Sequence, residues 1–140
     1  MSEQTFSGSC LCGSVAYEIA AEALRFYHCH CQRCRKATGT GHASNIIIRP
    51  SKVDWTAGAT LLKYYKVPEA QRFATNFCSN CGSLMPRIAP DMSIGVIPAG
   101  TLDHDPAIRP EARIFAGSRA DWSCDDHALS VHEEYPPPAD

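Results

Sequence analysis

Short apolar runs and alternating apolar and polar positions dominate this chain, and both patterns predict β-strands. Residues 15–19 alternate between apolar and polar side chains, which is typical of a strand with one buried face. Residues 43–48 contain three consecutive isoleucines, and a β-branched run of this kind packs best in a buried strand. Similar patterns, bounded by glycine and proline, predict further short strands at residues 53–56, 61–67, 72–77, 84–88 and 93–97.

Helical periodicity is scarce by comparison. Residues 32–38 favour one or two turns of helix, and we expect another short helix after Asp103 or Asp121. Ten prolines and nine glycines are spread along the chain and exclude long helices, because both residues destabilise helix interiors. The predicted fold class is therefore mainly β, built from small sheets joined by turns.

Composition and charge limit the classes of protein to which the chain can belong. Its 140 residues correspond to one domain, which we expect at 1–132, and three prolines predict a flexible tail at 133–140. The net charge of −2 argues against a nucleic-acid-binding protein, which usually has a marked basic excess. No apolar run is long enough to cross a membrane, and the first residues lack the pattern of a signal peptide. We therefore expect a cytoplasmic protein.

Cysteine is the residue type that changes this picture most. Seven of the eight cysteines fall into three tight clusters. Thiolates spaced this closely can converge on one soft metal ion, and zinc is the ion that most often occupies such turns. The clusters are Cys10-Leu-Cys12, Cys29-His-Cys31-Gln-Arg-Cys34 and Cys78-Ser-Asn-Cys81.

Two alternatives to metal binding are less consistent with the sequence. A disulfide framework is typical of small secreted chains, whereas the reducing cytoplasm keeps clustered thiols free for metal. A thioredoxin-like redox pair at Cys78 and Cys81 would open a helix after a strand, but Gly82 and its polar neighbours predict a turn. Metal binding is therefore the favoured interpretation.

The seven clustered cysteines suggest one site of four ligands and one of three. The first and third clusters resemble each other, because Gly13 and Gly82 directly follow their second cysteines and can adopt the positive φ of a tight turn. Together they would form a closed, structural site. The middle cluster supplies three thiolates and leaves one position open, as in a catalytic zinc site. Spacing alone does not exclude a different grouping.

Several residues near the middle cluster are candidates for accessory roles. Arg35 and Lys36 follow Cys34 and would lower the pKa of its thiol and attract an anion, unless they are ordinary solvated charges. His28 and His30 alternate with the cysteines, so we expect both to point away from the metal. His42 remains a candidate for a fourth ligand or an acid–base group. Cys124 lies outside the clusters and is interpreted as a spare thiol.

The spacing of the clusters closely resembles the family of glutathione-dependent formaldehyde-activating enzymes, whose domain is also called CENP-V/GFA. The resemblance extends to Gly117-Ser118-Arg119-Ala-Asp-Trp122 and so covers nearly the whole chain. Its principal motifs are Phe6-x-Gly8-x-Cys10-x-Cys12-Gly13-x-Val15-x-Tyr17, Cys29-His-Cys31-x-x-Cys34-Arg35-Lys36-x-x-Gly39 and Phe77-Cys78-x-x-Cys81-Gly82-Ser83.

The resemblance implies a β-tent fold of small antiparallel sheets with zinc-bearing turns and two zinc ions per chain. It assigns a structural zinc to the first and third clusters, which are Cys10, Cys12, Cys78 and Cys81. It assigns a second zinc to the cysteines of the middle cluster, which are Cys29, Cys31 and Cys34. Because that site is open, we expect its ion to be the more labile of the two. Membership also implies a carbon–sulfur lyase acting on S-hydroxymethylglutathione, the adduct of glutathione and formaldehyde. Arg35, Lys36 and Arg119 would bind the carboxylates of such a ligand.

Two other functions remain open at this stage. Three thiolates give a zinc site a nominal charge of −1, which weakens its Lewis acidity and favours the orientation or exchange of thiols. The chain could therefore bind glutathione or another small thiol without chemistry, or it could be a zinc-stabilised interaction protein, since a shared fold does not settle function. Several aromatic side chains would belong to the core or line a pocket, namely Trp55, Tyr64, Tyr65, Phe73 and Phe77.

Overall fold

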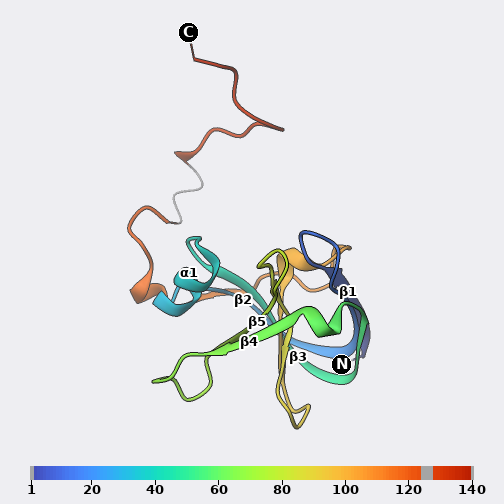
Figure 1. Cartoon of the computed structure of the whole chain (residues 1–140). Coiled ribbons are helices and arrows are strands. Elements are labelled where there is room, and N and C mark those ends of the chain that lie inside the picture. The colour runs from blue at the N-terminus through green and yellow to red at the C-terminus, as the bar shows by residue number, and fades with distance from the viewer. Residues whose placement is uncertain (1, 124–127, 140) are drawn as a thin grey trace.

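The computed structural model describes residues 2–123 and 128–139, which form two β-sheets and one short α-helix (Figure 1). The larger sheet has the strand order β1-β2-β3-β8-β7, and β9 pairs with β2 in the parallel sense. The other pairings in both sheets are antiparallel. The strands of the larger sheet span Gln4–Ser9 (β1), Ala16–Cys29 (β2), Ala43–Ala57 (β3), Arg87–Ile88 (β7), Gly95–Pro98 (β8) and Ala112–Ile114 (β9).

The long strands β2 and β3 carry much of the buried core. Apolar side chains alternate along both strands, and alternation places them on one face of the sheet. The side chains that are at most 2% exposed include Tyr17, Ile19, Ile46 and Ile48. The strand expected from the isoleucine run is thus confirmed, and only its middle member, Ile47, is half-buried.

The smaller sheet has the order β4-β5-β6 and continues into the larger sheet through Pro86. This buried proline is the single residue between β6 and β7, which belong to different sheets. Its carbonyl oxygen accepts a hydrogen bond of 3.1 Å from Asn76 Nδ2. The one strand expected at residues 84–88 was therefore wrong, because proline lacks the N–H group that would continue a ladder. The smaller sheet contains Leu62–Lys66 (β4), Ala74–Cys78 (β5) and Leu84–Met85 (β6).

A second proline, Pro50, lies inside strand β3 and does not interrupt it. The sequence predicted two strands, at 43–48 and 53–56, but the structure has one strand that runs through both. Strand β8 pairs with β3 only at residues 45–48, so Pro50 lies beyond the end of that ladder. On the other side β2 has a register shift between Ala20 and Ala21, where it faces the proline. Proline is tolerated at such bulges and unpaired edges.

The helix α1 spans Gln32–Thr38, as expected from the sequence. No helix follows Asp103 in the described region up to residue 123 except a 3-10 turn at Ala116–Ser118 (η3). Other 3-10 turns occur at Ala59–Leu61 (η1) and Ala99–Thr101 (η2). The helix considered after Asp121 falls partly on residues 124–127, outside the described residues.

The C-terminal segment contributes little to the packing of the sheets. All of residues 128–139 are exposed, and Figure 1 shows this segment running away from the strands. The division into a domain at 1–132 and a flexible tail at 133–140 stays a prediction. Across the described residues, none of the helices combines the length and the apolar character needed to cross a membrane.

Candidate functional site

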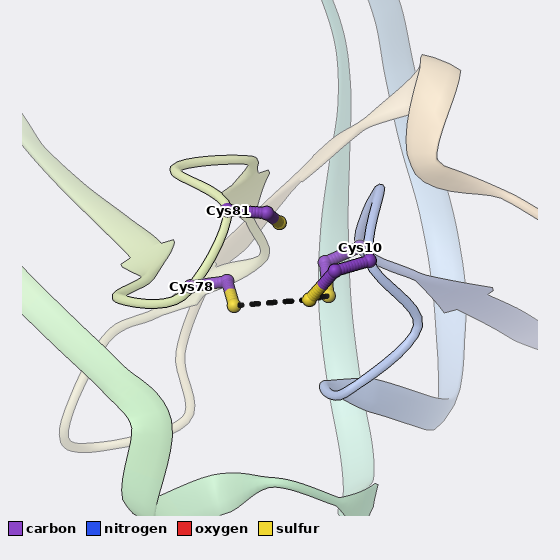
Figure 2. Close-up of side chains that lie close together, drawn as sticks. Cys10, Cys78 and Cys81 are labelled. Atoms are coloured by element: carbon purple, nitrogen blue, oxygen red, sulfur yellow. Dashed lines mark hydrogen bonds between the residues drawn. The ribbon is translucent and has the colours of Figure 1, made fainter.

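Four cysteines from distant parts of the chain meet where the two sheets approach each other. Cys10 and Cys12 lie in the turn between β1 and β2, whereas Cys78 and Cys81 lie in the turn between β5 and β6. The four sulfur atoms lie within 4.8 Å of one another, and we call them the four-cysteine group. Figure 2 shows Cys78 and Cys81 facing Cys10 across the gap between the two turns.

Each of the two turns has the tight backbone that its glycine predicted. Gly13 has φ +79° and Gly82 has φ +82°, the left-handed region in which glycine is favoured. In the first turn the N–H of Cys10 bonds the carbonyl of Val15, and in the second the N–H of Cys78 bonds the carbonyl of Ser83. The two turns therefore present their paired thiols in the same way.

The spacing of the sulfur atoms fits a tetrahedral metal ion. Four sulfurs bonded to zinc at about 2.3 Å lie about 3.8 Å from one another. The Sγ atoms of Cys10 and Cys12 are 3.6 Å apart, and those of Cys12 and Cys78 are 4.0 Å apart. This donor set could hold a metal ion, and its soft sulfur ligands are consistent with zinc.

Polar neighbours of this group favour thiolates, which are the form that binds metal. A hydrogen bond with the Ser14 side chain, helped by the Asn80 amide, lowers the pKa of Cys12 to about 7. A hydrogen bond with the Ser83 side chain lowers the pKa of Cys81 to about 5. Burial acts in the opposite direction and raises the pKa of Cys78.

The middle cluster forms a separate group on one continuous segment. Cys29 ends β2, Cys31 precedes α1, and Cys34 lies inside the helix. Their sulfur atoms also lie within 4.8 Å of one another, and we call them the three-cysteine group. Cys29 and Cys34 are each 6% exposed, whereas Cys31 is half-buried. The structure therefore brings the seven cysteines together as four and three, and the three could hold a second metal ion.

The thiols of the three-cysteine group differ in acidity. Burial raises the pKa of Cys29 and of Cys34. Burial also acts to raise the pKa of Cys31. Hydrogen bonds to its sulfur, of which the bond from the Cys34 backbone N–H is the most important, outweigh burial and lower the pKa of Cys31. The N–H of Cys34 lies 3.3 Å from Cys31 Sγ, which caps the helix. The expectation that Arg35 and Lys36 lower the pKa of Cys34 was thus wrong, because burial dominates.

Histidines surround the three-cysteine group without joining it. None of the histidines in the described part of the chain belongs to either metal-ligand grouping, so His42 is not placed as a fourth ligand. The rings of His28 and His42 lie 4.1 Å apart between centroids, and the hydroxyl of Ser44 lies 3.3 Å from His28 Nδ1 and 3.5 Å from His42 Nδ1.

The buried His30 has a defined protonation state. Its Nδ1 lies 3.1 Å from the carbonyl oxygen of Gly41, so this nitrogen must carry the donated hydrogen. Its Nε2 lies 3.2 Å from the guanidinium of Arg113, which can only donate, so Nε2 is the acceptor. Burial lowers the pKa of His30, with the charges of His42 and Arg113 acting in the same direction. His30 is therefore neutral and acts as a structural link.

A pocket of about 280 Å³ adjoins the three-cysteine group, and we call it the first pocket. Cys34 lines this pocket together with His42 and Ser44 from β3. Arg87 of β7 supplies a cation to the lining, and no sequence pattern had singled it out. The remaining polar lining comes mostly from neutral side chains, namely Thr38, Thr40, Asn45, Thr75 and Asn76.

A second pocket of about 470 Å³ is also lined by α1, through Gln32, Arg33, Lys36 and Ala37. The predicted substrate-binding residue Lys36 lines it, but Arg35 and Arg119 line neither pocket. Arg35 Nε is buried with no hydrogen-bond partner in the described structure. Arg119 lies near enough to His30 to contribute to the lowering of its pKa. Cys124 lies outside the described residues.

Comparison with known proteins finds one family model and one solved structure that are similar to this chain. Residues 5–118 match the family model described as glutathione-dependent formaldehyde-activating enzyme. A crystal structure of a Rhodobacter sphaeroides protein, a structural genomics target, is similar with a TM-score of 0.54 and 22% sequence identity. That likeness covers 76% of this chain and 97% of the other, and it supports the fold. A search of curated proteins finds no match.

Proposed function

The chain belongs to the family of glutathione-dependent formaldehyde-activating enzymes, and from this premise we propose that it is a zinc-dependent carbon–sulfur lyase. Its substrate would be the adduct of formaldehyde with a small thiol such as glutathione, S-hydroxymethylglutathione. The observation that carries the proposal is the three-cysteine group, which gathers three candidate ligands from the described residues and borders a pocket. A structural site would have a complete ligand set, as in the four-cysteine group.

The two groups of cysteines have different roles in this proposal. Cys10, Cys12, Cys78 and Cys81 would hold a structural zinc ion, which would link the turn after β1 to the turn after β5. Cys29, Cys31 and Cys34 would hold a second zinc ion, which would be accessible to the substrate from the first pocket. A zinc ion in such a site favours the thiolate form of a bound thiol at neutral pH.

The chain's own residues position the substrate and move one proton. Cleavage of the adduct requires loss of the hydroxyl proton as the carbon–sulfur bond breaks, which gives formaldehyde and a thiolate. The reverse reaction protonates the oxygen as the thiolate attacks the aldehyde. We assign this proton transfer to His42, which lines the first pocket with Cys34. The Nδ1 atom of His42 lies 3.5 Å from the hydroxyl of Ser44. We therefore assign the proton transfer with the substrate to the other ring nitrogen, Nε2.

Substitution of Cys31 by serine tests the proposal. We predict that Cys31→Ser abolishes turnover of S-hydroxymethylglutathione, because serine does not replace a thiolate ligand. Purified wild-type protein should contain two zinc ions per chain and the variant one, measured by elemental analysis. Circular dichroism should show the same β content in both proteins.

The results of this test also separate the alternatives. Equal turnover by Cys31→Ser would contradict a catalytic role for the three-cysteine group. Saturable binding of glutathione by calorimetry, without cleavage above the spontaneous rate, would indicate a thiol-binding module instead. Absence of both binding and turnover in the zinc-loaded wild type would favour a zinc-stabilised interaction protein.

A further inference from the structure

Three polar side chains beside the first pocket form a connected row across the larger sheet. His28 of β2 lies directly opposite Ser44 of β3 in the antiparallel ladder, and His42 immediately precedes β3, two positions before Ser44. Residues opposite each other across a ladder share one face of the sheet, and so do residues two positions apart. The hydroxyl of Ser44 accordingly lies 3.3 Å from Nδ1 of His28 and 3.5 Å from Nδ1 of His42. One hydroxyl thus connects the two imidazole rings.

The ring of His42 is held by several neighbours. It lies against the ring of His28, with the centroids 4.1 Å apart and an interplanar angle of 31°. The ring of His30 approaches it with centroids 5.1 Å apart at an angle of 60°. The hydroxyl of Thr40 donates a hydrogen bond of 2.6 Å to the carbonyl oxygen of His42 and so anchors its backbone. These contacts restrict how His42 can turn where it lines the first pocket.

The hydroxyl of Ser44 also couples the hydrogen positions of the two rings. A hydroxyl donates one hydrogen and accepts through its oxygen, whereas a neutral imidazole carries hydrogen on only one of its two nitrogens. If Ser44 donates to Nδ1 of His28, its oxygen accepts the hydrogen on Nδ1 of His42. The opposite direction would place the His42 hydrogen on Nε2. Only the first direction leaves Nε2 of His42 free to accept a proton.

We propose that His28 and Ser44 are positioning residues that hold neutral His42 in the tautomer with its hydrogen on Nδ1. This inference rests on the proposed function, in which Nε2 of His42 removes the hydroxyl proton of the adduct. The oxygen keeps the bonding pair and forms the carbonyl group, and the electron pair of the broken carbon–sulfur bond leaves with sulfur. His28 lines neither pocket, so it acts on the reaction through Ser44.

Nitrogen NMR of the zinc-loaded protein provides the first test. At alkaline pH, where both rings are neutral, the nitrogen shifts and their couplings to the ring protons identify which nitrogen of each histidine carries hydrogen. In the wild type, His42 should carry it on Nδ1 and His28 on Nε2. In Ser44→Ala, His42 should lose this preference and show a mixture of both tautomers. This measurement does not depend on turnover.

Kinetics of S-hydroxymethylglutathione cleavage provide the second test. Ser44→Ala should lower kcat about 5- to 10-fold and leave KM within about twofold, because one hydrogen bond between neutral groups is lost. Ser44→Thr keeps the hydroxyl and should retain kcat within about twofold of the wild type. Ser51→Ala is the matched control, since Ser51 is an exposed serine on the same strand that lines neither pocket.

Two substitutions of His28 separate a positioning role from a packing role. His28→Asn keeps an acceptor near the place of Nδ1 but loses the ring, whereas His28→Phe keeps an aromatic ring and loses the acceptor. We expect kcat close to the wild-type value for His28→Asn, and the same loss as in Ser44→Ala for His28→Phe. The double variant Ser44→Ala/His28→Phe should lose no more than either single variant, because both break one connection. Elemental analysis should find the same zinc content in every variant.

Contrary results separate failure of this inference from failure of the proposed function. If the wild type cleaves the adduct while His42 carries its hydrogen on Nε2, the inference fails and the proposed lyase function stands. The same holds if Ser44→Ala matches the wild type in kcat. Full activity of His28→Phe together with a loss in His28→Asn would assign His28 to packing and likewise overturn the inference. A zinc-loaded wild type that does not cleave the adduct would overturn the proposed function and this inference with it.

Discussion

Single side chains beside the sulfur atoms decide how well the four-cysteine group can hold a metal ion. Ser83 shows this most directly, because its Oγ accepts the N–H of Leu11 at 2.9 Å and lies 3.3 Å from Cys81 Sγ. Since the accepted bond leaves the hydroxyl hydrogen free, Ser83 can donate it to a Cys81 thiolate. One residue thus connects the two cysteine turns and stabilises the ligand form of a cysteine.

Removal of this hydroxyl should weaken metal retention without removing a ligand. We predict that Ser83→Ala lowers the affinity of the four-cysteine group for zinc by about 10- to 100-fold, the usual effect of losing an outer-sphere hydrogen bond. Competition with a coloured chelator measures the affinity. Ser79→Ala is the control, because Ser79 lies exposed in the same turn and contacts the rest of the protein through its backbone N–H. Equal affinities for the two variants would show that the hydroxyl has no such role.

The metal-ligand candidates were predictable from the sequence, whereas the pocket residues were not. Closely spaced cysteines before Gly13 and Gly82 restrict the possible ligand sets to a few, and the family resemblance selected the one that the structure brings together. Arg33, Glu69 and Arg87 carry no comparable local pattern. A pocket forms only when segments that are distant in the sequence come together in the fold. In the sequence, a charged residue that lines a pocket has the same local pattern as a charged residue on the solvated surface.

At the level of elements, the predictions succeeded where one local pattern decides the structure. The helix at Gln32–Thr38 and the buried isoleucine strand were confirmed. The predictions for the two prolines were wrong in opposite directions: the pattern predicted a strand end at Pro50 and a continuous strand through Pro86. A proline interrupts a strand only if its missing N–H faces a partner, and this depends on which strands are neighbours. The sequence did not predict the short strands β1 and β9, because each forms only by pairing with strand β2.

The strand β3 offers a test of how strictly burial alternates along an element. Ile46 is fully buried, and its neighbour Ile47 is half-buried on the opposite face. We predict that Ile46→Ala lowers the free energy of unfolding by about 3–4 kcal/mol, because it leaves a cavity in the core. Ile47→Ala, the matched control, should cost about 1–2 kcal/mol. Denaturant unfolding measures both values, and equal losses would contradict the assigned faces.

At the scale of the whole molecule, the two cysteine groups differ in what they connect. The four-cysteine group joins the turn after β1 in the larger sheet to the turn after β5 in the smaller sheet. Cys12 and Cys78, whose sulfurs are 4.0 Å apart, are separated by 66 positions in the sequence. A metal ion there would close a long loop, which restricts the unfolded chain. The three-cysteine group closes only the short connection between β2 and α1, so its metal should add little stability.

This difference predicts separate effects of metal loss on unfolding. Cys12→Ser should lower Tm by more than about 10 °C, because metal binding at a structural site contributes directly to folding. The loss should come mainly from the missing ligand, since Cys12 is exposed. Cys31→Ser should lower Tm by less than about 4 °C, and a strong chelator should still destabilise this variant as much as the wild type. Calorimetry of the zinc-loaded proteins gives each Tm. Equal losses from the two substitutions would show that the three-cysteine group also supports the fold, and its interpretation as an open reaction site would have to be abandoned.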